Sequence, residues 1–395
     1  MCIECGRCKQ VCPFGAISEV MRPCMRACSV NAVKMDENRK AMIDHDKCIS
    51  CGACVQQCPF GAIVDKSFVM NVLNLLRDSW NNTSYHVYAV VAPAVASQYT
   101  GIKVGQVFAG IKELGFYDVV EAAIAGDMVS VEEAKEFVET IEEKKWKTTS
   151  CCPAFVEYVR KNHPEYMDHV STVVSPMIAM ARAIRAKDRK ARIVFIGPCT
   201  AKKVEIKQDD VKGAVDYVLT FEELRAILDA RGLELAEMPE ITAGEPSSYG
   251  RIFARTGGVA ESVRRVAKLE GIETEINPIR CSGIEECIKT MKLASFGRLE
   301  ENLIEGMACK GGCTNGAASI FHDQRGIQRV NDFSRLALTD NPMEGIRGYD
   351  MAGVNMEREF PELEKMKEVT AGEKKAKKQA TAKAKKEAIA KGEME

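Results

Sequence analysis

The sequence predicts two parts of different fold class. A small, cysteine-rich α+β module comes first, and a large α/β domain with mainly parallel sheets flanked by helices follows it. Three observations support this division. Ten of the 17 cysteines lie in the first 58 of the 395 residues, and after residue 65 apolar strand-like runs alternate with amphipathic helical patterns. Such alternation produces parallel sheets whose functional loops follow the carboxyl ends of strands.

Charge and hydropathy exclude several classes of function. The 55 basic and 56 acidic residues leave a net charge of −1, so electrostatics gives no case for a nucleic-acid or anionic-membrane partner. No apolar run approaches the roughly 18 residues of a transmembrane helix. The first residues, MCIECGRCKQVCP, lack the pattern of a signal peptide. We therefore expect a cytoplasmic protein, in which many cysteines favour metal binding over disulfides.

The N-terminal module, residues 1–66, contains the same cysteine run twice. The two copies are Cys2, Cys5, Cys8 and Cys12-Pro13, and Cys48, Cys51, Cys54 and Cys58-Pro59. Each has the C-x2-C-x2-C-x3-C-P spacing of bacterial ferredoxins, in which the fourth cysteine ligates the other cluster. The expected ligand sets of two [4Fe–4S] clusters are therefore Cys2, Cys5, Cys8 and Cys58, and Cys48, Cys51, Cys54 and Cys12. Structural zinc is the weaker alternative, because zinc sites favour separated cysteine pairs.

Two further cysteines, Cys24 and Cys28, lie between the runs. A third site there would need two more ligands, and none is close in sequence. We interpret them as buried or free thiols in preference to an extra metal site.

The large domain begins with elements that its apolar patterns predict. Buried strands are expected at residues 87–91, 119–124, 193–196 and 215–219, and an amphipathic helix at 131–143. Thr220 and Glu223 form a capping box for a helix over 221–230, which Gly232 ends.

Three segments of this domain combine cysteine with proline or glycine. They are Thr149-Ser150-Cys151-Cys152-Pro153-Ala154-Phe155, Gly197-Pro198-Cys199-Thr200-Ala201-Lys202-Lys203-Val204-Glu205 and Glu305-Gly306-Met307-Ala308-Cys309-Lys310-Gly311-Gly312-Cys313. Loop backbone of this kind can approach a metal closely and donate N–H groups to sulfur. Four or five thiolates from three distant loops predict a third cluster. Lys202 and Glu205 add polar groups that metal ligation alone does not need, which indicates a reactive site.

These segments resemble the TSCCP, PCxxKxxE and ExMxCxxGC signatures of the [FeFe]-hydrogenases, in that order and behind a two-cluster ferredoxin domain. The resemblance covers residues 1 to about 360 and implies a two-lobed H-cluster domain at 80–362. It also implies a [4Fe–4S] cube on Cys152, Cys199, Cys309 and Cys313. In this family Cys313 would bridge to a two-iron subcluster with CO, cyanide and a bridging dithiolate.

The resemblance also implies roles for residues around the two-iron subcluster. Cys151 would pass protons to and from the dithiolate amine, and Lys202 would donate a hydrogen bond to a cyanide. Met307 would pack against the two-iron unit, and Ala92, Pro93 and Ala94 would line its other side. The matching proton path runs through Glu133 and Glu136, on one helix face, and Ser171.

The chain departs from the most studied members of the family at three places. Gly197 replaces a methionine, which is expected to open space beside the two-iron unit. Phe155 replaces a tryptophan, and Gly316-Ala317-Ala318-Ser319 replaces a glycine triplet. Cys281 and Cys287 match no signature and are interpreted as structural.

The predicted function is therefore a hydrogenase that interconverts protons and electrons with dihydrogen. A ferredoxin or flavodoxin would exchange electrons with it, and maturation proteins would supply the two-iron subcluster. The sequence contains no GxGxxG fingerprint, so direct use of NAD by this chain is not expected. One alternative is a hydrogen sensor with slow turnover, although the chain ends in a lysine-rich tail at 363–395 instead of a signalling domain. The other is an iron–sulfur assembly protein, against which Cys151, Lys202 and Met307 argue.

Overall fold

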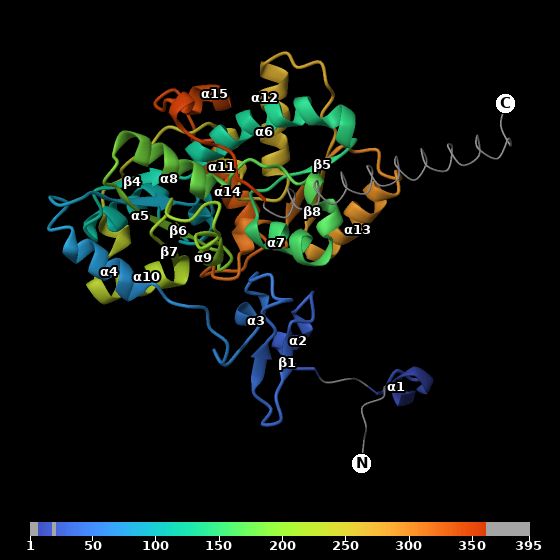
Figure 1. The fold of residues 1–395 in the computed structure, drawn as a ribbon. Helices are drawn as coiled ribbons and strands as arrows, with labels where there is room; N and C mark the ends of the chain where they lie inside the picture. Colours follow the sequence, from blue (N-terminus) through green and yellow to red (C-terminus); the bar gives the residue numbers. More distant parts are fainter. Residues whose placement is uncertain (1–6, 18–20, 361–395) are drawn as a thin grey trace, which may run out of the picture.

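The computed structural model describes residues 7–17 and 21–360. Figure 1 shows a small N-terminal module beside a larger domain of sheets and helices. Cys2, Cys5 and the predicted tail at 363–395 lie outside the described residues. Among the described helices, none combines the length and apolar character that crossing a membrane requires.

The first lobe of the large domain is built on a four-stranded parallel sheet. Its strands lie in the order β4 (Asp118–Glu121), β3 (Val87–Val91), β6 (Arg192–Gly197) and β7 (Tyr217–Thr220). The two central strands are almost fully buried, which explains their continuous apolar sequences. The helices of this lobe are α4 (Val69–Asp78), α5 (Val104–Glu113), α8 (Pro176–Lys187) and α10 (Phe221–Arg231). The four strands predicted from sequence are all present, and the second and fourth are shifted by a few residues.

The second lobe contains a three-stranded parallel sheet that sequence patterns did not predict. Its order is β5 (Lys147–Thr148), β9 (Leu303–Met307) and β8 (Pro278–Ser282). The first of these strands is too short to show a period, and the central one carries Glu305 and Gly306 inside its apolar run. Helices α7 (Pro153–Asn162), α12 (Gly258–Leu269) and α13 (Ile284–Ser295) contact this sheet.

A long helix, α6 (Ala123–Lys144), connects the two lobes. It begins at Ala123, well before the predicted start at residue 131, and so shortens the strand predicted at 119–124. Residues 123–130 are buried throughout, so they have no polar face that would reveal a helical period. Within them, Asp127 accepts a hydrogen bond of 2.7 Å from the backbone N–H of Ser247.

Two other sequence predictions concern the edges of elements. The capping box is confirmed, since the Thr220 hydroxyl accepts from Glu223 N and the Glu223 carboxylate accepts from Thr220 N. Gly232 ends this helix with a φ of 70°. Phe68 and Val72 belong to the core of the first lobe, so the large domain begins before residue 80. The other α-helices of the large domain are α9 (Lys202–Glu205), α11 (Ser248–Ile252), α14 (Gly326–Ser334) and α15 (Pro342–Gly345).

The N-terminal module contains the helices α1 (Arg7–Val11), α2 (Pro23–Arg26) and α3 (Ala53–Gln56) and the antiparallel hairpin of β1 (Val33–Met35) and β2 (Ala41–Ile43). Its second cysteine run lies against the large domain. The Thr200 hydroxyl donates to Ser50 O at 3.0 Å, and Lys161 Nζ donates to Cys48 O at 2.8 Å. Ile49 is 1% exposed and packs in the same core cluster as Phe155.

The contact between Phe155 and Gly306 predicts a local test of packing in the second lobe. A Cβ added to Gly306 would lie 2.5 Å from the Phe155 ring, so Gly306→Ala should lower the free energy of unfolding by about 1–3 kcal/mol. Because Phe155→Leu removes the clashing ring, the two changes together should cost less than their sum in a urea-unfolding double-mutant cycle. Gly348→Ala is the control, since no atom lies within 4 Å of an added Cβ there. Additive costs would contradict this packing argument.

Candidate active site

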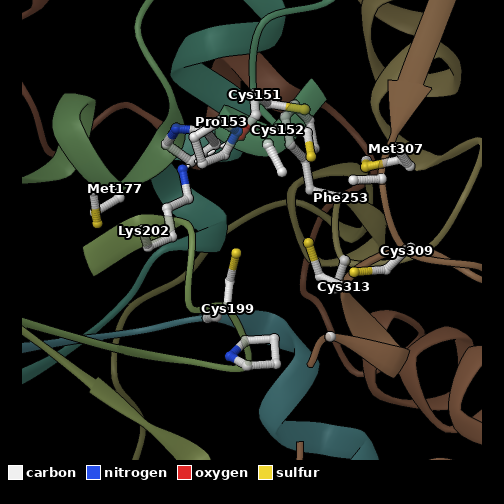
Figure 2. Close-up of a pocket in the computed structure, with 18 of the residues that line it drawn as sticks. Cys151, Cys152, Pro153, Met177, Cys199, Lys202, Phe253, Met307, Cys309 and Cys313 are labelled. Atoms are coloured by element: carbon white, nitrogen blue, oxygen red, sulfur yellow. Dashed lines mark hydrogen bonds between the residues drawn. The ribbon is translucent and has the colours of Figure 1, made fainter. Parts of the chain in front are cut away.

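The predicted site segments meet at one cavity between the two sheets. Strands β3, β6, β5 and β9 each end at this cavity, and they are followed by Ala92-Pro93, Pro198-Cys199, Cys151-Cys152 and Ala308-Cys309. The cavity encloses about 870 Å³ of space not filled by protein atoms, including its mouth. Figure 2 shows cysteine side chains from three chain segments facing this space. Parallel topology thus brings together loops that are spread over more than 200 residues of the sequence, from Ala92 to Cys309.

Four of these thiols fit the ligand set of a [4Fe–4S] cube. Cys199 and Cys313 have their pKa raised to about 11 and about 12, first by burial and next by the neighbouring cysteines, Cys152 among them. Burial also raises the pKa of Cys309, and its next causes are Cys199, Cys152 and Cys313. To bind as thiolates, such buried and mutually repelling groups would require a cationic centre between them. Within the described residues no three His, Cys, Asp or Glu side chains are grouped tightly enough for a single metal ion.

The backbone around Cys313 requires glycine. Gly312 has a φ of 84°, and a Cβ there would lie 2.7 Å from Thr256 N and 2.8 Å from Arg255 C. This close approach sets Cys313 against the 254–256 segment, where Thr314 N donates to Ala254 O at 3.1 Å. The glycine of the third signature is therefore needed for the position of the following cysteine.

Lys202 is a buried cation with a fixed counter-charge. Its Nζ donates to Glu205 Oε2 at 2.7 Å and to Cys151 O at 3.3 Å. Burial opposes protonation of Lys202, but Glu205 together with Cys199 and Cys151 outweighs burial, and the pKa of Lys202 is raised. An ammonium has three donors, so a third proton can serve a group inside the cavity that Lys202 lines. Glu205 is itself 0% exposed and lies 3.8 Å from Arg358 Nη1.

The predicted proton-path residues lie together beside the cavity. Burial raises the pKa of Cys151, and the next largest cause is the charge of Glu133. Glu133 Oε1 accepts from Ser150 N at 3.3 Å, and its Oε2 is buried without a hydrogen-bond partner. Burial, followed by the neighbouring charge of Glu136, raises the pKa of Glu133 to about 8. Glu136 accepts from Thr172 N at 2.9 Å and also hydrogen-bonds with the Ser171 hydroxyl.

Lys147 is a member of this group that sequence reasoning missed. It precedes the first signature on β5, and its Nζ lies 2.8 Å from Glu136 Oε1. Burial alone would raise the pKa of Glu136, but Lys147, Ser171 and the backbone of Thr172 together outweigh burial and the pKa is lowered. Lys147 is 3% exposed, and a lysine buried to this extent is rare without a paired carboxylate. Its burial is the signal that would have identified it, and the alternating sequence pattern does not reveal that burial.

Glu305 connects strand β9 of the site to helix α12, and the sequence analysis assigned no role to this residue. Its two carboxylate oxygens accept from Gly257 N at 2.6 Å and Ala260 N at 2.8 Å, at the start of α12. Burial raises its pKa to about 7. The glutamate of the third signature thus ties β9, and the loop with Cys309, to a helix N-terminus.

The expected wall of the cavity is present with two corrections. Met307, Ala92 and Pro93 line it, but Ala94 is 0% exposed in the core of the first lobe and does not. The glycine at position 197 opens no space, because a Cβ there would lie 2.7 Å from the Phe195 ring. Phe195, which also lines the cavity, fills the expected gap. Phe253 and Ala254 are further lining residues that no motif indicated.

The cavity also touches the N-terminal module through Cys51. This residue of the second cysteine run lines the cavity, and its charge is among the causes that raise the pKa of Cys309. Cys281 and Cys287, by contrast, are 1% and 0% exposed in the core of the second lobe. Their burial agrees with the structural role expected for them.

The ion pair of Lys147 and Glu136 predicts a pH-dependent stability effect. Because the pKa of Glu136 is lowered in the folded state, its ionised form stabilises the fold at pH values above the ordinary carboxyl pKa. This contribution to stability is lost as the pH falls through the lowered pKa. Lys147→Met should therefore cost roughly 3 kcal/mol at pH 7, and the deficit should shrink in acid. Denaturant unfolding across pH measures it, and adding Glu136→Gln should recover part of the loss. Lys135→Met, at an exposed pair with Glu132, is the control. A deficit that is the same at every pH would contradict the ion-pair explanation.

Known proteins similar to this chain agree with the geometry. Residues 85–317 match the family described as "Iron only hydrogenase large subunit, C-terminal domain", and residues 1–18 and 41–64 match the 4Fe-4S binding domain. An apo [FeFe]-hydrogenase structure from Chlamydomonas reinhardtii aligns with a TM-score of 0.59 at 22% identity, over 72% of this chain and 93% of that one. This structural likeness shows the fold.

Curated relatives include both hydrogenases and assembly proteins. Iron hydrogenase 1 of Clostridium pasteurianum is 28% identical over 391 residues, with 84% of this chain and 65% of that protein covered. The periplasmic [Fe] hydrogenase large subunit of Nitratidesulfovibrio vulgaris is 28% identical over 307 residues, covering 64% of this chain and 72% of that protein. Cytosolic iron-sulfur assembly component 3 of Mus musculus is 25% identical over 282 residues, covering 57% and 59%. The chain thus spans just under two thirds of the first of these relatives. Since the family match covers more than half of its residues, the chain belongs to the iron-only hydrogenase large-subunit family.

Proposed function

We propose that the protein is an [FeFe]-hydrogenase that interconverts two protons and two electrons with dihydrogen. One observation carries the proposal: the cavity that gathers four cluster-fitting thiols also holds the thiol of Cys151 and the cation of Lys202. A cluster that only transferred electrons or was only carried would need neither group. A proton carrier and a buried donor beside the metal site are what hydrogen chemistry requires.

The residues present fit the family's cofactor. Cys152, Cys199, Cys309 and Cys313 would hold the [4Fe–4S] part, with Cys313 also bridging to the two-iron subcluster. When bound, that subcluster with its CO, cyanide and dithiolate supplies the metal site at which dihydrogen is formed or split. Lys202 would orient a cyanide through its free N–H, and its pairing with Glu205 keeps it protonated. Met307, Ala92 and Pro93 line this space with apolar groups and would limit the access of water to a bound subcluster.

Proton movement is assigned to Cys151 and the carboxylates behind it. Cys151 holds a proton at its Sγ, because burial keeps the pKa of the thiol high. Glu133, with a pKa of about 8, is mostly protonated at neutral pH and can exchange a proton with that thiol. Glu136 is held ionised by Lys147 and hydrogen-bonded with Ser171, so it can accept a proton at the outer end. The side chain of Glu136 is 16% exposed, whereas Glu133 is 4% exposed.

Electrons are proposed to enter through the N-terminal module. The second cysteine run lies against the large domain, and Cys51 is the member beside Cys309. Low-potential ferredoxin-type clusters suit a reaction as reducing as proton reduction. We infer a ferredoxin or flavodoxin as the external carrier and maturation proteins as the source of the two-iron subcluster.

Similarity to cytosolic iron–sulfur assembly proteins makes an assembly role the second candidate. Infrared spectroscopy of the protein after maturation separates the two functions. We expect stretches of iron-bound CO and cyanide together with hydrogen evolution from a reduced donor. A fully iron-loaded protein without those stretches would rule out the hydrogenase proposal and favour assembly. The stretches with only very slow turnover would indicate a hydrogen sensor.

The proton route predicts a separation of activity from cofactor content. Cys151→Ala and Glu133→Gln should each reduce hydrogen turnover by about a hundredfold or more while the infrared bands persist. Because burial raises the pKa of Glu133 to about 8, Glu133→Gln should also remove an inflection near pH 8 from the rate profile. Glu132→Gln is the matched control, since that side chain pairs with Lys135 at the helix surface and should leave turnover unchanged. Wild-type rates in either variant would remove that residue from the route.

A further inference from the structure

The segment between the two ferredoxin runs repeats the second half of each run. Residues 24–33 read Cys-Met-Arg-Ala-Cys-Ser-Val-Asn-Ala-Val, and residues 54–63 read Cys-Val-Gln-Gln-Cys-Pro-Phe-Gly-Ala-Ile. Residues 8–17 share the pattern as Cys-Lys-Gln-Val-Cys-Pro-Phe-Gly-Ala-Ile. The three copies have in common Cys-x3-Cys, a turn residue and then Ala with Ile or Val. Ser29 and Asn31 replace the proline and glycine, so the ferredoxin pattern does not reveal this third copy.

The local geometry of the third copy is that of the other two. Asn31 N donates to Cys28 O at 3.2 Å, where Gly61 N donates to Cys58 O and Gly15 N to Cys12 O at 3.3 Å. The turn residue has a positive φ in each case: 51° at Asn31 and 59° at both glycines. Asparagine is among the few non-glycine residues that adopt this conformation readily.

The sulfur of Cys28 has the same backbone donor as a ferredoxin ligand. Ala32 N donates to Cys28 Sγ at 3.1 Å, and Ala62 N donates to Cys58 Sγ at 3.3 Å. Hydrogen bonds of this kind stabilise the thiolate form that binds iron.

The tertiary structure pairs the second run with this third copy. Helix α2, which begins at Pro23, packs against α3 of the second run, and the turn after it leads into β1. Figure 1 shows α2 beside α3 and β1, whereas α1 is set apart from them. The result is a ferredoxin-like unit built from residues after position 20.

The surroundings of the thiols agree with this pairing. Burial raises the pKa of Cys51 to about 12, and the charges of Cys54, Cys28 and Cys48 add to it. Cys54 likewise has its pKa raised by burial, then by Cys48 and Cys28. For Cys12 the pKa is lowered, and the largest causes are backbone N–H groups of its own turn.

We propose that Cys28, in place of Cys12, is the fourth ligand of the cluster held by Cys48, Cys51 and Cys54. The cluster beside Cys309 is then closed within residues 28–54, and Cys48 and Ser50 in this range contact the large domain. Cys12 becomes available to the first run. This inference depends on the proposed iron–sulfur content of the module and not on hydrogen chemistry.

The test counts iron and records electron paramagnetic resonance of the reduced full-length protein. Cys54→Ala defines the spectral component of this cluster and should remove about four iron atoms, the content of one cube. Cys28→Ala should remove the same component and the same iron, and Cys28→Ala with Cys54→Ala should remove no more. Cys12→Ala should retain the component. Ser29→Ala, which changes the same exposed turn without removing a thiol, is the matched control and should keep both iron and spectrum.

A second substitution separates ligation from folding of the module. A serine oxygen can replace sulfur on iron, so Cys28→Ser should keep the component but shift its g values. Wild-type g values in Cys28→Ser, or loss of the component in Cys12→Ala, would overturn the assignment. Neither result depends on the infrared bands, so this inference can fail while the hydrogenase proposal stands, and the reverse is also true.

Discussion

The burial of four thiols in one apolar cavity is the constraint on which the rest of the structure depends. As thiolates, these groups would be stable there only when bound to a cation, and each must arrive on backbone that can approach the others closely. Parallel strands satisfy this need, because their carboxyl ends collect at one edge of a sheet. Two sheets that face the same space double the number of loops available. The cavity is therefore a consequence of topology before it is a consequence of any side chain.

Buried charge around the cavity is balanced group by group. Lys202 is paired with Glu205, and Glu305 is bonded to two backbone N–H groups at the start of α12. Glu136 is paired with Lys147. An isolated charge at such depth would cost several kcal/mol, so every partner fixes the position of a site loop as well as its charge. The unbonded oxygen of Glu205 lies 3.8 Å from Arg358 Nη1, whereas Glu133 has a buried oxygen without a hydrogen-bond partner and forms no ion pair within the described residues. A carboxyl group left in this state is suited to gaining and losing a proton.

Attachment of the N-terminal module follows from the same packing. Ile49 lies in the core beside Phe155, and the hydrogen bonds to Ser50 O and Cys48 O hold the second cysteine run at the cavity. The proposed electron carrier would have to stay close to the proposed catalytic cluster, and burial of an apolar residue between two cysteines achieves this without a covalent link. The proposed role of Cys28 adds to this, since it would close the cluster from inside the docked part of the module.

The sequence by itself determined the family and the first sheet, and it predicted the chemistry that is proposed for the site. Cysteine spacing is a local property, and continuous apolar runs such as 87–91 and 193–196 identify buried strands without knowledge of the fold. Tertiary structure decided what depends on contact between distant residues. It supplied the second sheet, whose central strand carries Glu305 because α12 offers two N–H groups. It paired Lys147 with Glu136 and placed the Phe195 ring where Gly197 was expected to leave a gap. It also packed α2 against α3. This packing places Cys28 beside the second cysteine run, where the regular ferredoxin spacing had predicted Cys12. Spacing identifies which residues can bind metal, whereas packing decides which of them meet.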